Sequence, residues 1–240
     1  MNEAAVRPAA PAPPPDIETA IEHSLPGIRP ESIRDLAEHG RMRVFRDGEI
    51  VFHQGEEVPL ILLLRGHGGF RRTTVDGQQV MVGVASPDEI FGLTSASATI
   101  ATVELIALTE LEAMVWRGEV LRRLIAEDPT VALRIVDRLS LFLTILTEKV
   151  DGFLHQDARR RVIRILARHR DLFFRDPPVL SRTHLPGLVG TSREMTGRVL
   201  RELERERIVM RIGRTGLELL DPRPLDAEIP LPSTARKRSP

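Results

Sequence analysis

The feature that most constrains the fold is a long helical pattern that begins at Asp128-Pro129. Asp128 is a favourable N-cap, and proline suits the first helical position. The 3-4-3-4-3 spacing of a coiled-coil seam then runs through Val136, Leu139, Leu143, Leu146, Val150 and Phe153. A second apolar stripe contains Ile135, Phe142 and Ile145. We expect the seam to pair with the same helix of a second subunit and the stripe to cover a β domain. A buried helix within a monomer is the alternative.

The chain before this helix has a different pattern. From about residue 42 to residue 116, short apolar runs alternate with turn signals such as Asp47-Gly48 and Asp76-Gly77. Regularly spaced turns between short strands predict a β-sandwich or barrel, and Val75-Asp76-Gly77-Gln78 predicts a hairpin turn. Residues 16–40 carry a weak helical signal, which Pro26 and Pro30 interrupt.

The chain after the long helix predicts a helical domain. Residues 157–170 form a basic helix with Val162, Ile165 and Leu166 facing inward. Ser181 to Val189 predicts a short helix in which Pro186 costs one hydrogen bond, and Gly190 makes a turn. A helix from Ser192 to about Arg205 and a hairpin around residues 213–216 follow. This order is typical of a winged helix-turn-helix.

The helix from Ser192 has two unlike faces. Met195, Val199, Leu200 and Leu203 lie on an apolar face, whereas Arg193, Glu194, Gly197, Arg198 and Arg201 lie opposite. Arginine forks match the two major-groove acceptors of guanine, and a carboxylate accepts from the amino group of cytosine. The pattern therefore predicts sequence-specific binding to double-stranded DNA. Glu194 has a second interpretation, because Thr191-x-x-Glu194 also fits a capping box.

Charge supports this assignment. The 240 residues carry 34 basic and 34 acidic side chains, but residues 156–215 are net +8 and residues 1–155 net −8. Only the later part is expected to meet a polyanion. There is no cysteine, which excludes disulfides and cysteine-ligated iron–sulfur clusters. No membrane span or secretory signal is visible, so we expect a cytoplasmic protein.

The predicted fold class is α+β. We expect a disordered tail over residues 1–15, an effector domain with a jelly-roll or cupin-like double-stranded β-helix over 16–127, and a dimerisation helix over 128–154. A winged helix-turn-helix follows over 155–222, and a second disordered tail, with Arg236-Lys237-Arg238 near its end, over 223–240.

The order of these parts resembles the Crp–Fnr family of bacterial transcription regulators over about residues 42–222. The most specific match is the run from Val189 to Leu200; weaker ones are Asp47-Gly48-Glu49, Gln54-Gly55, Glu89-Ile90-Phe91-Gly92 and Thr147-Glu148-Lys149-Val150. The resemblance implies that Arg193 and Arg198 read guanines and Glu194 a cytosine, while Thr191 and Ser192 hold phosphates. The DNA-binding set is completed by Arg201. The resemblance also implies a homodimer on a palindromic site and RNA polymerase as a partner.

The resemblance fails in the effector pocket. Cyclic-nucleotide binders of the family hold ribose and phosphate with a Gly-Glu pair and a later arginine. Here Leu93 stands at the glutamate position and Ala101 or a neighbour at the arginine position. Burying a phosphate without a paired cation costs several kcal/mol. We therefore expect no cyclic nucleotide in a pocket formed by Phe91, Leu93, Ala101, Leu146 and Thr147, but an unidentified effector or none.

Other functions have weaker support. A haem-dependent gas sensor would need an axial ligand from His53 or His67, the two histidines of the β region. A metal-dependent cupin-like enzyme would need ligands at short spacing, yet these histidines lie 14 positions apart. A protein-binding helix-turn-helix would not need the arginine face. We therefore expect no enzyme activity, no metal and no cofactor.

Overall fold

The computed structural model describes residues 16–228; within this range the side chains of residues 153–155 are outside the description. The two expected tails at residues 1–15 and 229–240 lie outside the described residues. The chain opens with two helices, α1 (Ile17–Ser24) and α2 (Pro30–His39). Asp16 caps α1 by accepting from the N–H of Thr19, and Pro30 opens α2. The weak helical signal over residues 16–40 is thus confirmed, with Pro30 starting a helix rather than breaking one.

Eight strands and a short 3₁₀ helix form the β domain. The elements are β1 (Arg41–Phe45), β2 (Ile50–Phe52), β3 (Leu60–Arg65), β4 (Gly68–Thr73), β5 (Gln79–Ala85), β6 (Ile90–Phe91), η1 (Leu93–Ser97), β7 (Glu104–Ala107) and β8 (Leu111–Trp116). They make two antiparallel four-stranded sheets, in the orders β1-β8-β3-β6 and β2-β7-β4-β5. The expected hairpin turn joins β4 to β5, with Thr73 opposite Gln79 and Gly77 at a φ of +73°.

The β domain has one core between its sheets and another outside them. Alternation along the strands sends Phe45, Ile61 and Leu105 into the space between the sheets. The neighbouring residues of β3, such as Leu60 and Leu62, face outward and pack against α1, α2, α3 (Gly118–Glu127) and the start of α4. β3 is therefore buried on both faces, which explains its unbroken apolar run.

The long helix α4 (Pro129–His155) begins where the sequence places it. The Asp128 carboxylate accepts from the N–H of Thr130 at 3.0 Å, from Ser32 Oγ at 2.7 Å and from the N–H of Arg29 at 3.1 Å. One buried carboxylate thus ties α4 to the loop before α2 and to α2 itself. Farther along, the Arg138 guanidinium donates twice to the Ser24 carbonyl, at the end of α1. These bonds fix α4 to the first half of the chain.

The described part of the C-terminal domain contains five helices and one hairpin. They are α5 (Ala158–Arg168), α6 (Arg170–Phe173), α7 (Leu185–Val189), α8 (Arg193–Arg205), β9 (Val209–Ile212), β10 (Gly216–Leu219) and α9 (Arg223–Asp226). Helix α7 starts at Leu185 rather than Ser181, so Pro186 lies in the first turn and costs no hydrogen bond. Leu225 of α9 is fully buried in the domain core. The prediction of a disordered tail from residue 223 is therefore wrong for residues 223–228.

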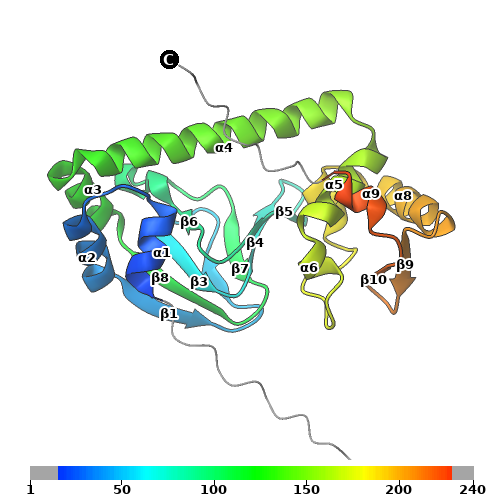
Figure 1. Cartoon of the computed structure of the whole chain (residues 1–240), viewed down its shortest axis with the longest axis horizontal. Helices are drawn as coiled ribbons and strands as arrows, with labels where there is room; N and C mark the ends of the chain where they lie inside the picture. Colours follow the sequence, from blue (N-terminus) through cyan, green and yellow to red (C-terminus); the bar gives the residue numbers. More distant parts are fainter. Residues whose placement is uncertain (1–15, 229–240) are drawn as a thin grey trace, which may run out of the picture.

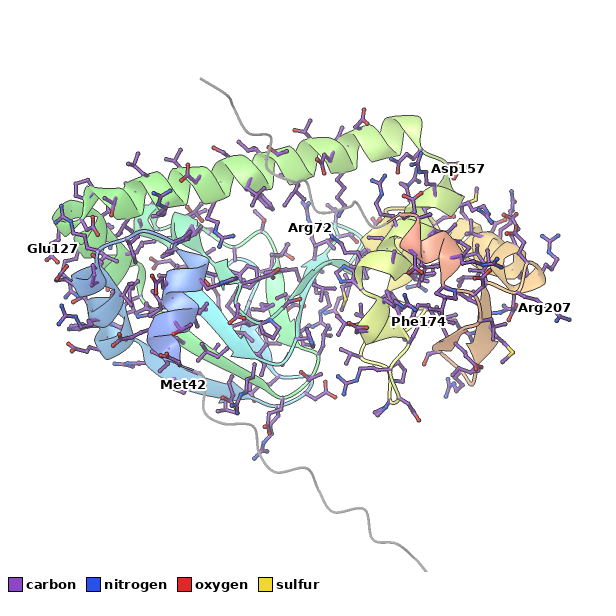
Figure 2. The ribbon with its side chains drawn as sticks, viewed as in Figure 1. Met42, Arg72, Glu127, Asp157, Phe174 and Arg207 are labelled. Carbon is purple, nitrogen blue, oxygen red and sulfur yellow. The ribbon has the colours of Figure 1, made fainter. Side chains whose placement is uncertain are left out.

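Figure 1 shows how these parts are arranged. Helix α4 runs above the β domain for most of its length, and α5–α9 lie below and beyond its far end. In Figure 2, Glu127 marks the end of the helix next to the β domain, and Asp157 marks the turn into the C-terminal domain. The mixed α+β architecture, with a β-sandwich and helices, is as predicted.

Candidate DNA-binding face and effector pocket

The turn between α7 and α8 depends on one glycine. Gly190 caps α7 with a φ of +67°, a left-handed conformation that costs glycine little. Three side chains of α7 are buried in the core of the C-terminal domain and anchor the helix there: Leu185, Leu188 and Val189. The chain leaves the turn through Thr191 and enters α8 at Ser192. The turn thus sets the angle at which α8 is presented.

Helix α8 is capped by Ser192, whose hydroxyl oxygen accepts from the N–H of Met195 at 3.0 Å. A capping box would pair the cap residue with the third helical position, which is Met195 here. Glu194 is the second helical residue, so the capping-box interpretation of Thr191 and Glu194 is wrong. The Glu194 side chain is exposed on α8.

The two faces of α8 are those that the sequence predicts. Val199, Leu200 and Leu203 are buried, as is Thr196, while Met195 is only partly buried. Arg193, Arg198 and Arg201 are exposed with Glu194 on the opposite side. A Cβ at Gly197 would meet only the Arg201 guanidinium, at 3.8 Å. Gly197 therefore leaves an open place in the middle of the arginine face.

The structure adds two arginines that the sequence interpretation missed. A hollow of about 340 Å³ is lined by Arg182, Thr183, Pro186, Arg193, Thr196, Gly197, Leu200 and Arg211. Arg182 precedes α7, and Arg211 lies on β9. The β9–β10 hairpin therefore brings the Arg211 guanidinium to the edge of α8, although Arg211 lies 13 positions after Arg198 in the sequence. The basic charge of residues 156–215 was the available signal, but it does not say which arginines share a face.

Both arginines are held in place by neighbours. The Arg211 guanidinium forms an ion pair with Glu204, at 2.6 Å, and its backbone N–H donates to the same carboxylate at 3.0 Å. Hydrogen bonds from Arg211 lower the pKa of Glu204, which keeps this carboxylate charged. Arg182 donates to the Arg214 carbonyl, and its N–H donates to the Thr215 carbonyl at 2.9 Å. The hairpin is thus fastened to the start of α7.

The predicted seam of α4 is exposed in the chain. Val136, Leu139, Leu143, Leu146 and Val150 are all open to solvent, Leu143 to 62%. The Phe153 side chain lies outside the description. In the second stripe Ile135 is buried against the β domain, but Phe142 is 56% exposed. The prediction that this stripe covers the β domain is therefore wrong at Phe142, whereas Ile145 is partly buried.

The five expected pocket residues are divided between two cores and the long helix α4. Phe91 and Ala101 lie at the core between the sheets, where the rings of Phe91 and Phe70 pack edge to face with their centroids 5.0 Å apart. Leu93 packs into the other core, beneath α1 and α3. Leu146 is exposed on α4, and the Thr147 hydroxyl donates to the Leu143 carbonyl of its own helix.

The two histidines of the β domain also lie apart. His53 is exposed, whereas His67 lies at the β3–β4 turn with a buried Nδ1. In the described part of the chain no three His, Cys, Asp or Glu side chains group as metal ligands. No helix among the described residues is long and apolar enough to cross a membrane.

Comparison with known proteins agrees with this architecture. Residues 42–128 match the cyclic nucleotide-binding domain family. Over 201 residues the chain is 28% identical to the cyclic AMP receptor protein of Thermus thermophilus, a match covering 80% of this chain and 90% of that relative. The chain is a relative of the Crp–Fnr transcription regulators.

Solved structures of Crp–Fnr regulators share the fold. The c-di-GMP-responsive regulator CLP of Xanthomonas campestris has a TM-score of 0.64 at 24% identity, with 80% of this chain and 99% of that chain covered. The Crp-family regulator TTHB099 of Thermus thermophilus has a TM-score of 0.62 at 22% identity, with 78% and 95% covered. Both solved neighbours are described as regulators, TTHB099 as a transcriptional regulator.

Proposed function

We propose that the protein is a homodimeric, sequence-specific DNA-binding transcription regulator that acts in the cytoplasm. The observation that carries this proposal is the exposed face of α8, on which Arg193, Glu194, Arg198 and Arg201 surround Gly197. Buried residues on the other side of α8 hold the helix, so that face is free to enter a major groove. On this proposal α7, the Gly190 turn and α8 are a helix-turn-helix, and β9–β10 is its wing.

Base contacts come from three side chains in this proposal. Arg193 and Arg198 each donate two hydrogen bonds to a guanine, and Glu194 accepts from a cytosine amino group. Because Ser192 and not Thr191 caps the helix, the Glu194 carboxylate takes no part in a capping box and is available to contact a base. Each such pair supplies about 1–3 kcal/mol of discrimination against the wrong base.

Phosphate contacts frame the base contacts. Thr191 and Ser192 lie at the N-terminus of α8, where hydroxyls and the helix dipole favour an anion. The Ser192 oxygen accepts within the cap, so its O–H remains to donate. Arg182 and Arg211 stand on the α7 and hairpin sides of the hollow. We infer that these two arginines contact the DNA backbone beside the groove that α8 enters.

Dimer formation follows from the exposed face of α4. Side chains from Val136 to Val150 follow coiled-coil spacing and are open to water, and a second copy of α4 would bury them. A two-fold axis along this seam would place two α8 helices on half-sites about one helical turn apart. The family resemblance adds RNA polymerase as the partner that the bound dimer contacts.

We propose further that cyclic nucleotides are not the effector. Leu93 stands where the resemblance implies the glutamate and Ala101 or a neighbour where it implies the arginine, and Ala101 is 5% exposed in an apolar core. A phosphate there would lose hydration without gaining a cation. A jelly-roll or cupin-like domain without that charge pair fits an apolar effector or none. Haem is not favoured, because His53 is exposed and His67 faces the C-terminal domain rather than the core between the sheets.

Salt-dependent binding to duplex DNA tests the proposal. Anisotropy of a labelled duplex should show affinity falling steeply with salt, because each phosphate contact releases counterions. Arg182→Ala should weaken binding to all sequences alike and reduce the salt slope by about 1. Arg41→Ala removes the same charge from exposed β1, far from α8, and should change neither quantity. If no salt-sensitive binding occurs at low ionic strength, the proposal is wrong.

Glu194→Ala separates base reading from a structural role. We expect unchanged thermal stability and a relaxed preference at one base pair. A loss of stability with an unchanged preference would remove Glu194 from the reading set.

A further inference from the structure

The β domain and the C-terminal domain share one hydrophobic cluster. Met81 of β5 is 8% exposed and packs in the same core as Leu185 and Leu188 of α7. Val84 of β5 and Leu108, just after β7, line the edge of that core. Figure 1 shows β4 and β5 reaching toward α5 and α6. We call this contact, formed by β5 with Leu108 and His67 on one side and α5–α7 on the other, the interdomain seam.

Gly187 sets how closely the seam packs. A Cβ at this position would lie 2.4 Å from the Met81 carbonyl oxygen and 2.6 Å from Val80 Cγ1. Gly187 is inside α7 and has an ordinary helical backbone conformation. Glycine is therefore required here by the close approach of α7 to β5, and not by a left-handed φ. Helix and strand backbones therefore touch directly. Such a contact is lost as soon as the two domains separate slightly.

The polar edge of the seam is occupied by His67. The turn that carries it is fixed, because the His67 N–H donates to Thr109 Oγ1 at 2.9 Å and its carbonyl accepts from the Leu108 N–H at 2.8 Å. The ring nitrogen Nδ1 is buried with no hydrogen-bond partner among the described residues. A neutral ring tolerates this place better than an imidazolium, in which both nitrogens must donate.

The groups that face this edge are mostly cations. His67 is close enough to Arg175 and His169 for charge coupling, and His169, between α5 and α6, is coupled also to Arg168. Arg168 acts in turn on Glu89 and on Lys149. Lys149 of α4 donates to the Val82 carbonyl of β5 at 3.3 Å, on the same strand as Met81. Arg138 also acts on Glu89, so this carboxylate is coupled to two of the cations.

Both histidines are held neutral by these surroundings. Burial, then Arg168 and then His67 lower the pKa of His169 to about 4. Burial and Arg175 lower the pKa of His67, against a smaller opposing effect of the Ala85 backbone. The docked domains therefore bind fewer protons than separated domains would at mildly acidic pH.

We propose that the interdomain seam is a proton-sensitive latch, closed while His67 and His169 are neutral and opened when they gain protons. Opening frees the C-terminal domain to turn on the residues after α4, and it changes the orientation of α8 relative to the dimer seam. Protonation places two more positive charges beside Arg168 and Arg175, and the Ala85 backbone offsets only part of what burial and Arg175 cost the charged His67 ring.

The sign and size follow from linkage. The pKa of each histidine is lower in the closed form than in the open form. Above the ordinary histidine pKa near 6.5 this difference does not change the closed-to-open ratio. Below that pH, the open form binds more protons and the closed form becomes increasingly disfavoured. If the whole shift of His169 to about 4 depends on docking, the closed-to-open ratio falls by about 20-fold between neutral pH and about pH 5. His67 adds to this in the same direction.

A distance measurement on the full chain tests the latch without DNA. Because the protein has no cysteine, Glu18→Cys in α1 and Glu218→Cys in β10 give two unique sites for a donor and an acceptor dye. Labelled chains are mixed with a large excess of unlabelled chain, so that each assembly carries one labelled pair. Single-molecule energy transfer then reports the two domains of one chain as pH is lowered from about 7.5 to about 5.

Four chains give the result. The wild type should shift from one narrow docked population to a broad separated one as pH falls. The double variant His67→Gln with His169→Gln should remain docked throughout. Gly187→Ala should be separated already at neutral pH, because its Cβ cannot fit against Met81. Gly152→Ala in α4 is the matched control, since its Cβ meets nothing closer than 3.5 Å, and it should behave as the wild type.

Three outcomes would overturn the latch: a wild type that stays docked at about pH 5, a double variant that opens as the wild type does, or a Gly187→Ala chain that stays docked. His184 provides an internal check. Its Nδ1 accepts from the Ser181 N–H within the C-terminal domain, and it is unchanged in the double variant. Opening caused by His184 would therefore persist there and count against the proposal. The distance measurement uses no DNA, so the latch can be confirmed even if the protein does not bind DNA. Likewise, DNA binding can be confirmed even if the domains do not separate at low pH.

Discussion

The two ends of α4 carry functional surfaces of opposite kinds. In the C-terminal domain, the Gly190 turn and the Ser192 cap place Arg193, Arg198 and Arg201 on one exposed face within a dozen positions of the chain. In the β domain, Phe91 and Leu93 are two positions apart but belong to different cores. A surface built on one helix follows from the helical period. A pocket built from several strands depends on sheet register and on the helices that cover it.

This difference explains which end can be assigned a ligand. The face of α8 needs no distant segment except Arg182 and Arg211 at its edges. The β domain has the family's fold, yet its apolar side chains fill the space between the sheets. Helix α4, which joins the two ends, also has two different sides. Hydrogen bonds of Asp128 and Arg138 hold one side to the N-terminal helices, whereas the seam from Val136 to Val150 is exposed to solvent.

The largest expected effect comes from breaking the two-fold symmetry that we propose for DNA binding. Leu143→Asp puts a charge in the middle of the α4 seam, and we expect a monomer by sedimentation at micromolar concentration. Affinity for a palindromic site should fall by about 100-fold or more, because two tethered contacts become one. Leu141→Asp is the control. Leu141 is 51% exposed but lies almost opposite on the helix, at about 100° per residue. Equal behaviour of both variants would refute this seam.

The next effect tests base reading on α8. Arg198→Ala should weaken binding to the preferred site by about 1–3 kcal/mol, which is roughly 5–150-fold, and relax the preference at one base pair. Arg41→Ala should leave both unchanged. Uniform weakening across all sequences would instead make Arg198 a phosphate contact.

A smaller effect is expected at the pinned end of α4. Asp128→Asn keeps the shape but removes the charge that accepts from Thr130, Ser32 and Arg29, so we expect about 1–2 kcal/mol less stability by chemical unfolding. Burial would raise the pKa of Asp128, but hydrogen bonds from Thr130, Ser32 and Arg29 outweigh it and lower the pKa to about 2. This contribution is fully present above about pH 4 and is lost as pH falls toward 2.

The variant supplies the check on that assignment. Its stability should be less sensitive to acid in this range than that of the wild type. If both chains lose stability equally between about pH 4 and about pH 2, other carboxylates cause the acid response.

The smallest effect concerns the β domain. Titration of a fluorescent cyclic AMP or cyclic GMP analogue should give no saturable signal in the micromolar range, and the nucleotides should not change DNA affinity. Saturable micromolar binding would show that this end has kept its family ligand by other contacts.

The sequence predicted the parts that depend on local period and punctuation. Asp128-Pro129 starts α4, the β4–β5 turn lies at Gly77, and the two faces of α8 were correct. What it missed depends on contacts across the fold. Pro186 falls in a first turn because the residues before it are not helical, and α9 forms because Leu225 reaches the α5 core. Nothing in the sequence near Gly187 or His67 says that a strand more than 100 positions from α7 packs against it.

Selection of bound duplexes from a random pool reports base preference, half-site spacing and dimer symmetry in one experiment. We expect enrichment of a palindrome whose half-sites contain guanine and cytosine positions about one helical turn apart, and loss of one position per half-site in Arg198→Ala. Enrichment of a single asymmetric site, or no enrichment above the unselected pool, would contradict this expectation.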